Sequence, residues 1–126
     1  ILYQQPDNMR VLVYGASTNS ARYAYIATKL LLEKGHEVFL VGIKKGEVEG
    51  ISIQHNQPII PDIDTVTLYV GPQHQQDLLV YIKQLAPKRV IFNPGTENPA
   101  LMSELIKQGI QVEEACTLVL LHTGQF

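Results

Sequence analysis

The chain has one cysteine, a low share of charged residues and no long apolar segment, and each scarcity excludes a class of protein. The single cysteine allows no intrachain disulfide, so a reducing, cytoplasmic compartment is expected. The apolar stretches fall far short of the roughly 20 residues that a membrane helix needs. A formal net charge of −2 gives no electrostatic reason to expect nucleic acid or an anionic membrane as a partner.

Catalytic and metal-binding motifs are also missing from the sequence. There is neither a G-x-S-x-G elbow nor a phosphate-binding P-loop, and the four histidines have no metal-ligand spacing with one another or with Cys116. Cys116 precedes a predicted helix, where a thiol can be activated, but isolated cysteines are more often inert and we favour that interpretation. Glu113 and Glu114 are interpreted as solvated, because adjacent strand residues point to opposite faces. We therefore expect a domain without a complete catalytic centre.

The length and composition predict one globular domain with a core of its own. The chain has 126 residues, of which 45% are hydrophobic and 17% charged. The first eight residues precede Met9 and lack the basic start and apolar core of a signal peptide. We expect residues 1–8 to be a leader or a disordered N-terminus and residues 9–126 to form the domain.

A recurring apolar run that stops at glycine predicts the sheet. Four such runs cover residues 10–15, 38–42, 66–71 and 90–95, and a weaker fifth covers residues 109–112. The runs are continuously apolar and rich in β-branched residues, which is typical of parallel strands covered on both faces.

Helical patterns alternate with these strands. They cover about residues 20–34, 74–85, 98–108 and 117–122. Strict alternation predicts right-handed crossovers and an α/β fold, a three-layer, doubly wound Rossmann-like arrangement with a mostly parallel five-stranded sheet. The segment of residues 46–64 breaks the rhythm and is predicted to be a loop with at most a short strand.

Two loops at the predicted carboxyl edge of the sheet suggest a phosphorylated ligand. Residues 15–20 lie where a dinucleotide fingerprint would lie, although only its first glycine is present and Ser17 and Ser20 take the other two places. Backbone N–H groups there suit a phosphate, and the alternative is that Ser17, Thr18 or Asn19 merely caps the helix. The second strand is followed by Lys44 rather than by a carboxylate for ribose hydroxyls. A lysine suits coenzyme A or NADP, both of which carry an extra phosphate near the ribose, unless it is only solvated surface.

Taken together, several segments resemble the coenzyme A-binding domain family, whose relatives include the N-terminal domain of the succinyl-coenzyme A synthetase α subunit. The landmarks are residues 13–17, 32–38, 41–44 with Gly50, 70–72, 93–95 and 109–116. The resemblance implies that Gly15, Ser17 and Thr18 lie along the cofactor phosphates and that Lys44 meets the phosphate at the adenosine end. It also implies that Val70 and Pro72 flank the adenine or the pantetheine arm. Many relatives carry a basic residue where this chain has Thr18, and Arg22 is expected to replace that charge. The predicted cofactor-binding residues are Gly15, Ala16, Ser17, Thr18, Asn19, Arg22, Lys44, Val70, Pro72, Pro94, Gly95 and Thr96.

The resulting hypothesis is a stand-alone protein that binds coenzyme A or an acyl-coenzyme A, without a catalytic centre of its own, as a carrier, sensor or regulatory partner. One alternative is a small NADP-binding oxidoreductase or nicotinamide sensor. Another is a protein-interaction subunit with a degenerate nucleotide pocket, associated with a separate ligase-type partner. A homodimer is a further expectation.

Overall fold

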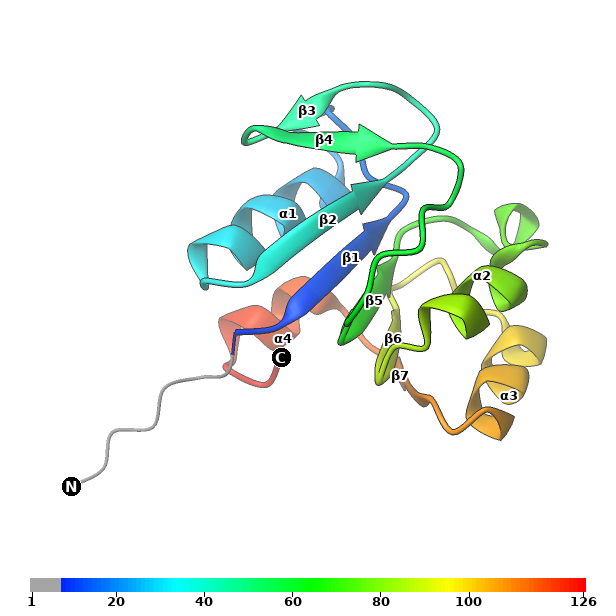
Figure 1. Ribbon diagram of the computed structural model, residues 1–126. Helices are drawn as coiled ribbons and strands as arrows, with labels where there is room; N and C mark the ends of the chain where they lie inside the picture. The colour runs from blue at the N-terminus through cyan, green and yellow to red at the C-terminus, as the bar shows by residue number, and fades with distance from the viewer. Residues whose placement is uncertain (1–7) are drawn as a thin grey trace.

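The computed structural model describes residues 8–126, and it is an α/β fold in which helices cover both faces of one twisted sheet (Figure 1). The prediction for the N-terminal leader falls outside the described residues apart from Asn8. The elements in chain order are β1 (Arg10–Tyr14), α1 (Tyr23–Glu33), β2 (Glu37–Val41), β3 (Glu47–Val48), β4 (Ile51–Gln54), β5 (Thr65–Leu68), the short 3-10 helix η1 (Pro72–His74), α2 (Leu78–Leu85), β6 (Arg89–Phe92), α3 (Pro99–Lys107), β7 (Gln111–Glu114) and α4 (Thr117–His122).

The sheet confirms the predicted doubly wound, mostly parallel architecture. Its strand order is β3-β4-β2-β1-β5-β6-β7, and every neighbouring pair is parallel except the β3–β4 hairpin. Since β2 and β5 flank β1 on opposite sides, the chain changes direction across the sheet at β1. This is the switch point at which open α/β sheets form a crevice.

The prediction of five strands is wrong, because the sheet has seven. The segment of residues 46–64, predicted to be mainly a loop, contains the β3–β4 hairpin, whose turn is formed by Glu49 and Gly50 with φ of 50° and 81°. β4 extends the parallel sheet through pairing of Leu40 with Ile53. The side chains of Val48 in β3 and Ile53 in β4 are buried, and this burial explains why the hairpin packs onto the sheet rather than extending into solvent.

The two faces of the sheet have separate cores. On one face, α2 and α3 pack through residues such as Ile82 and Leu105 onto Leu12 and Phe92. On the other, α1 and α4 pack through Leu31 and Leu121 onto the adjacent positions of the same strands, Val11 and Val13 among them. Figure 1 shows this division, with α1 and α4 on one side and α2 and α3 on the other. Consecutive strand residues are thus buried on opposite faces, as the continuous apolar runs predicted.

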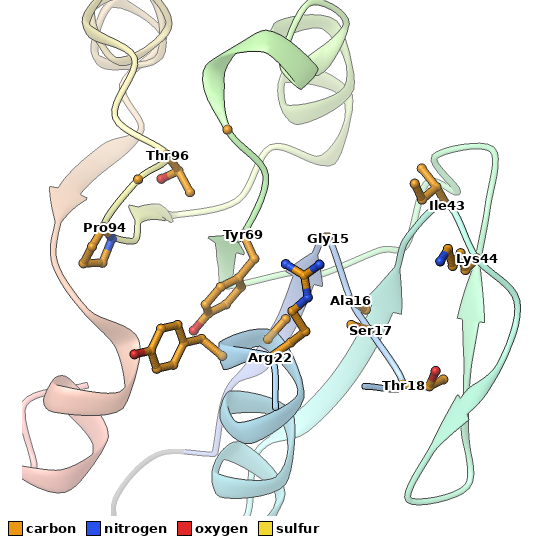
Figure 2. A pocket seen from close by; sticks show the side chains of 14 residues that line it. Gly15, Ala16, Ser17, Thr18, Arg22, Ile43, Lys44, Tyr69, Pro94 and Thr96 are labelled. Carbon is orange, nitrogen blue, oxygen red and sulfur yellow. The ribbon is translucent and has the colours of Figure 1, made fainter. Parts of the chain in front are cut away.

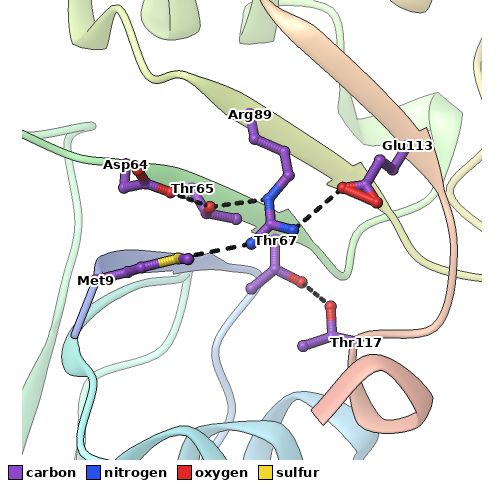
Figure 3. A network of polar contacts seen from close by, with 7 residues as sticks. All are labelled: Met9, Asp64, Thr65, Thr67, Arg89, Glu113 and Thr117. Atoms are coloured by element: carbon purple, nitrogen blue, oxygen red, sulfur yellow. Dashed lines mark hydrogen bonds and ion pairs between the residues drawn. The ribbon is translucent and has the colours of Figure 1, made fainter. Parts of the chain in front are cut away.

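A polar network crosses the amino edge of the sheet (Figure 3). Arg89, only 8% exposed, donates from Nε to the Thr65 hydroxyl and from Nη1 to Glu113, each at 3.1 Å. The interpretation of Glu113 as solvated is therefore wrong. The reason is that β7 is the strand next to β6 in the sheet, which brings the Glu113 carboxylate within reach of Arg89. Glu114, the next residue, is exposed as expected.

No helix among residues 8–126 is long and apolar enough to span a membrane.

Candidate functional site

The carboxyl ends of β1, β2, β5 and β6 meet at one edge of the sheet, and the turn after β1 lies at its centre. The N–H groups of Gly15 and Ala16 both donate to the carbonyl oxygen of Val41, at 2.8 and 3.0 Å. Gly15 has φ of 96°, and a Cβ there would come within 2.8 Å of Val70 Cγ1. Only glycine fits this position, because it alone adopts the conformation freely and leaves room for the loop after β5.

A cavity of about 350 Å³ opens beside this turn (Figure 2). It joins the start of α1 to the loops that follow β2, β5 and β6. Its lining residues are Gly15, Ala16, Ser17, Thr18, Arg22, Tyr23, Ala24, Ile43, Lys44, Tyr69, Gly71, Pro94, Gly95 and Thr96. Four loops that are far apart in the sequence thus form one wall.

The structure brings together nine of the twelve predicted cofactor-binding residues in this first cavity. They are Gly15, Ala16, Ser17, Thr18, Arg22, Lys44, Pro94, Gly95 and Thr96. Val70 lines a second cavity instead, while Asn19 and Pro72 line neither of the two. Asn19 stabilises the turn before α1 instead, since its Oδ1 accepts a hydrogen bond from the N–H of Ala21 at 2.9 Å. Pro72 begins η1.

The charge lining the first cavity is entirely positive. Arg22 and Lys44 both reach it, no carboxylate lines it, and neither cation forms an ion pair with a carboxylate of the described residues. Both are exposed at the rim. Because no carboxylate of the described residues neutralises these two cations, both are available to an anionic ligand.

Backbone N–H groups add to this positive character. α1 begins at Tyr23, and its N-cap is Arg22, which makes no side-chain cap. The N–H groups of Tyr23 and Ala24 donate to no acceptor within the described residues. A helix N-terminus with free N–H groups favours an anion through both hydrogen bonding and the helix dipole.

The turn before α1 is shaped by its own side chains rather than by helix capping. The hydroxyl of Ser17 accepts a hydrogen bond from the N–H of Asn19 at 3.0 Å, which leaves its proton free to donate. The prediction that the helix begins near residue 20 is wrong by three residues, because these local bonds compete with the first helical turn. The capping alternative is also wrong, since none of Ser17, Thr18 and Asn19 caps α1.

A second cavity, of about 440 Å³, meets the first along Gly15, Ala16 and Ile43. Its remaining wall comes from the ends of β1 and β2, the loop after β4, and the region of η1. Its lining residues are Tyr14, Gly15, Ala16, Val41, Gly42, Ile43, His55, Asn56, Gln57, Val70 and His74. The two cavities together therefore straddle the turn after β1.

The sequence pattern of the coenzyme A (CoA) binding domain family matches residues 9–122, nearly all of the described chain. The chain belongs to the CoA binding domain family. This confirms the resemblance drawn from the loops. No curated protein matches the chain.

Several solved structures resemble this CoA binding domain in fold. An uncharacterized protein is 48% identical, with a TM-score of 0.94 over 96% of this chain and 100% of its own. A hypothetical protein from Pyrococcus horikoshii is 27% identical, with a TM-score of 0.82 over 94% of this chain and 84% of its own. Aspartate semialdehyde dehydrogenase II from Vibrio cholerae is 14% identical, with a TM-score of 0.53 over 86% of this chain and 42% of its own. That last likeness shows the fold alone.

Sequence reasoning missed five residues that line the first cavity of this CoA binding domain: Tyr23, Ala24, Ile43, Tyr69 and Gly71. Tyr69 is the most unusual, because its hydroxyl is buried without a hydrogen-bond partner among the described residues. Burial raises the pKa of Tyr69 to about 12, and the nearby hydroxyls of Thr117 and Thr67 oppose this only in part. The phenol therefore stays protonated and is suited to donate a hydrogen bond rather than to act as a base. Its place near the carboxyl end of the third apolar run was the available signal.

Titratable residues outside the first cavity form no evident second centre. Among the described residues there is no group of three or more histidine, cysteine, aspartate or glutamate side chains that could hold a metal ion. Cys116 is half-buried at the N-cap of α4 and is unpaired.

Proposed function

We propose that this chain binds CoA or an acyl-CoA as a stand-alone protein, in a carrier, sensor or regulatory role. The proposal rests on the first cavity. Its lining includes Arg22 and Lys44, which pair with no carboxylate of the described residues, and the free N–H groups at the start of α1. CoA carries three phosphates, and a cavity of this kind supplies what they require. Membership of the CoA binding domain family supports the same ligand.

Each wall of the cavity has a proposed part in holding the ligand. The pyrophosphate lies against Ser17 and Thr18 and the start of α1, with Arg22 beside it. Lys44, on the opposite rim, meets the phosphate on the ribose. The pantetheine arm then follows the wall of residues 94–96. The ring of Tyr69 lies between these regions in Figure 2, while its hydroxyl is buried beside Thr67 and Thr117.

The chemistry of the lining residues supports binding rather than reaction. The first cavity has no carboxylate and no histidine among its lining residues, so it offers none of the usual general bases. Tyr69, whose pKa is raised to about 12, does not serve as one near neutral pH. Binding by a domain of this kind and transfer chemistry by another are separable contributions.

Titration calorimetry with CoA, acetyl-CoA and NADPH tests the proposal. CoA or its acyl form is expected to bind, with NADPH clearly weaker. Absence of heat with millimolar CoA would refute the proposal and favour an interaction subunit with a degenerate pocket. Tighter binding of NADPH would favour the nicotinamide alternative, which Lys44 also permits because NADP carries a ribose phosphate.

Lys44 provides a sharper test of the binding mode. Lys44→Ala is expected to weaken CoA by roughly fivefold, because it removes one charge-assisted contact at an exposed rim. The same change should leave 3′-dephospho-CoA nearly unaffected, since that ligand lacks the phosphate concerned. Lys45→Ala is the matched control, because Lys45 is equally exposed and lines neither cavity. Equal losses for both ligands would show that Lys44 does not contact the ribose phosphate.

A further inference from the structure

Two loops that follow adjacent strands form one wall of the first cavity. The loop after β5 (69–71) and the loop after β6 (94–97) both contribute lining residues, and Figure 2 shows Tyr69 on the first and Thr96 on the second. Pairing between β5 and β6 ends before either loop begins. No backbone hydrogen bond of the described residues joins the two loops. Their spacing therefore depends on side chains.

The side-chain amide of Gln75 joins these two loops from outside the cavity. Its Nε2 donates to the carbonyl oxygen of Val70 and to that of Thr96, each at 2.9 Å. Its Oε1 accepts from Nδ2 of Asn98 at 2.9 Å, and Asn98 caps α3. Asn93 links the ends of β5 and β6, but within the described part of the chain only Gln75 bonds to both loops.

Gln75 is buried behind the wall rather than placed on it. It is 4% exposed and lines neither of the two cavities. Its NH₂ group has two acceptors and its oxygen has a donor, so the amide is bonded within the protein. A buried amide with three partners is held in one orientation. The position of Gln75 therefore fixes the distance between the carbonyl groups of the two loops.

The same hydrogen bonds direct two acceptors away from the cavity. A carbonyl oxygen carries partial negative charge, and one directed into the cavity would repel a phosphate. The carbonyl oxygens of Val70 and Thr96 are directed toward Gln75 in the interior instead. Gln75 thus determines both the shape and the polarity of this wall.

We propose that Gln75 is a positioning residue, which bridges the two loops and thereby holds the wall along which the pantetheine arm lies. The inference rests on the proposed function, because that function places the arm along residues 94–96. It adds a residue that does not contact the ligand. A wall held in this way before binding favours affinity, because the ligand does not have to order the two loops.

The two halves of CoA provide the binding test. Gln75→Leu keeps a similar volume and removes all three hydrogen bonds. CoA, 4′-phosphopantetheine and adenosine 3′,5′-bisphosphate are each titrated into the unchanged protein and into this variant, directly or by displacement of CoA. Affinity for CoA and for 4′-phosphopantetheine is expected to fall roughly tenfold, because the ligand must then order both loops. Affinity for adenosine 3′,5′-bisphosphate should change little.

Control variants separate positioning from stability. Gln76→Leu makes the same substitution at the next residue, which is exposed and lines neither cavity, and it should bind both halves normally. Arg89→Met removes hydrogen bonds at the opposite edge of the sheet, so it should lower stability without changing either affinity. Thermal unfolding checks that each variant is folded at the temperature of the titration. If Gln75→Leu is not, Gln75→Met fills the same space with a more adaptable side chain and takes its place.

Amide hydrogen exchange gives a second measurement, which needs no ligand. The N–H of Thr96 bonds to the carbonyl oxygen of Asn93 at 3.0 Å, and the N–H of His74 bonds to that of Gly71 at 2.9 Å. In Gln75→Leu both are expected to exchange roughly tenfold faster, since the loops open more often. Exchange within β1 and α1 should be unchanged.

The outcomes distinguish the role of Gln75 from the proposed function. If the unchanged protein does not bind CoA, the proposed function fails and the ligand-positioning role fails with it. If it binds CoA but the substitution at Gln75 weakens neither half, or weakens both halves equally, the positioning role alone is overturned. Unchanged exchange at Thr96 and His74 would overturn that role as well, whatever the titrations give.

Discussion

The side chain of Asn93 connects the sheet, the site and the last helix, and its removal gives the clearest stability prediction. Asn93 is 2% exposed at the end of β6. Its Nδ2 donates to the Thr67 hydroxyl at 2.7 Å and to the Leu68 carbonyl oxygen at 2.8 Å, while its Oδ1 accepts from the N–H of Thr117 at 2.8 Å. The backbone carbonyl oxygen of Asn93 accepts a hydrogen bond from the hydroxyl of Thr96 at 2.7 Å, and Thr96 lines the first cavity.

Asn93→Leu keeps a similar volume but removes all three of these side-chain hydrogen bonds. Each net hydrogen bond contributes about 1 kcal/mol, and a buried partner left unpaired costs about 1–3 kcal/mol. The N–H of Thr117 is such a partner, because it forms no other hydrogen bond within the described residues. We therefore expect the free energy of unfolding to fall by about 3–5 kcal/mol, a large part of the roughly 5–15 kcal/mol typical of a domain.

Urea denaturation followed by circular dichroism measures this loss. Asn98→Ala is the comparison, because half-buried Asn98 accepts from the N–H of Leu101 at 3.2 Å as the cap of α3 and donates to Gln75 Oε1 at 2.9 Å. Loss of the cap costs about 1 kcal/mol, and loss of the second hydrogen bond costs about 1 kcal/mol more. The reasoning about Asn93 would be refuted if Asn93→Leu cost no more than Asn98→Ala. Such a result would mean that α4 is held by its apolar contacts alone.

Two further stability predictions concern the opposite edge of the sheet. Arg89→Met is expected to lower the free energy of unfolding by about 2–4 kcal/mol, since it leaves the Glu113 carboxylate without its partner and removes one of the two hydrogen bonds of the Thr65 hydroxyl. Adding Glu113→Gln should recover part of this loss, and denaturant midpoints measure both effects. Burial first, and Arg89 second, lower the pKa of His36 below its ordinary value of 6.5, so the unfolded chain takes up this proton first as pH falls. The contribution of His36 to the free energy of unfolding should therefore decrease as the pH falls through the ordinary pKa of 6.5, and it should be constant well above that pH. A His36→Gln variant with the same pH profile would contradict the linkage.

The sequence predicted those parts of the fold that depend on local signals. The limits of α3 follow from Asn98 and Pro99 at its start, and those of the main strands follow from apolar runs that stop at glycine. The β3–β4 hairpin escaped prediction because its strands are short and its stability comes from pairing with β2, a contact that no local pattern encodes. The late start of α1 likewise depended on which of two local hydrogen-bonding arrangements Ser17 and Asn19 adopt.

The sequence predicted which loops meet at the candidate site, but not every side chain that these loops contribute to it. Parallel strands place the loops that follow them at one edge, so Gly15, Lys44 and Gly95 were expected to meet, and they do line one cavity. Tyr69, which follows the buried strand β5, was missed for a different reason. In strands buried on both faces there is no alternation of polar and apolar residues to show which side chain points to which face. The face of the sheet on which Tyr69 lies therefore became known only from the structure.

Polar groups without partners are distributed unevenly over the molecule. At the amino edge, Arg89 uses both its hydrogen bonds and its flat face, which lies 4.5 Å from the centroid of the Phe126 ring. At the carboxyl edge, two buried side-chain atoms of the described residues lack partners, and they belong to Tyr69 and His55, one in the wall of each cavity. Native domains satisfy nearly all buried polar groups, and their exceptions tend to mark function. Both exceptions therefore lie at the edge of the sheet where the two cavities open, whereas the buried polar side chains at the amino edge are paired.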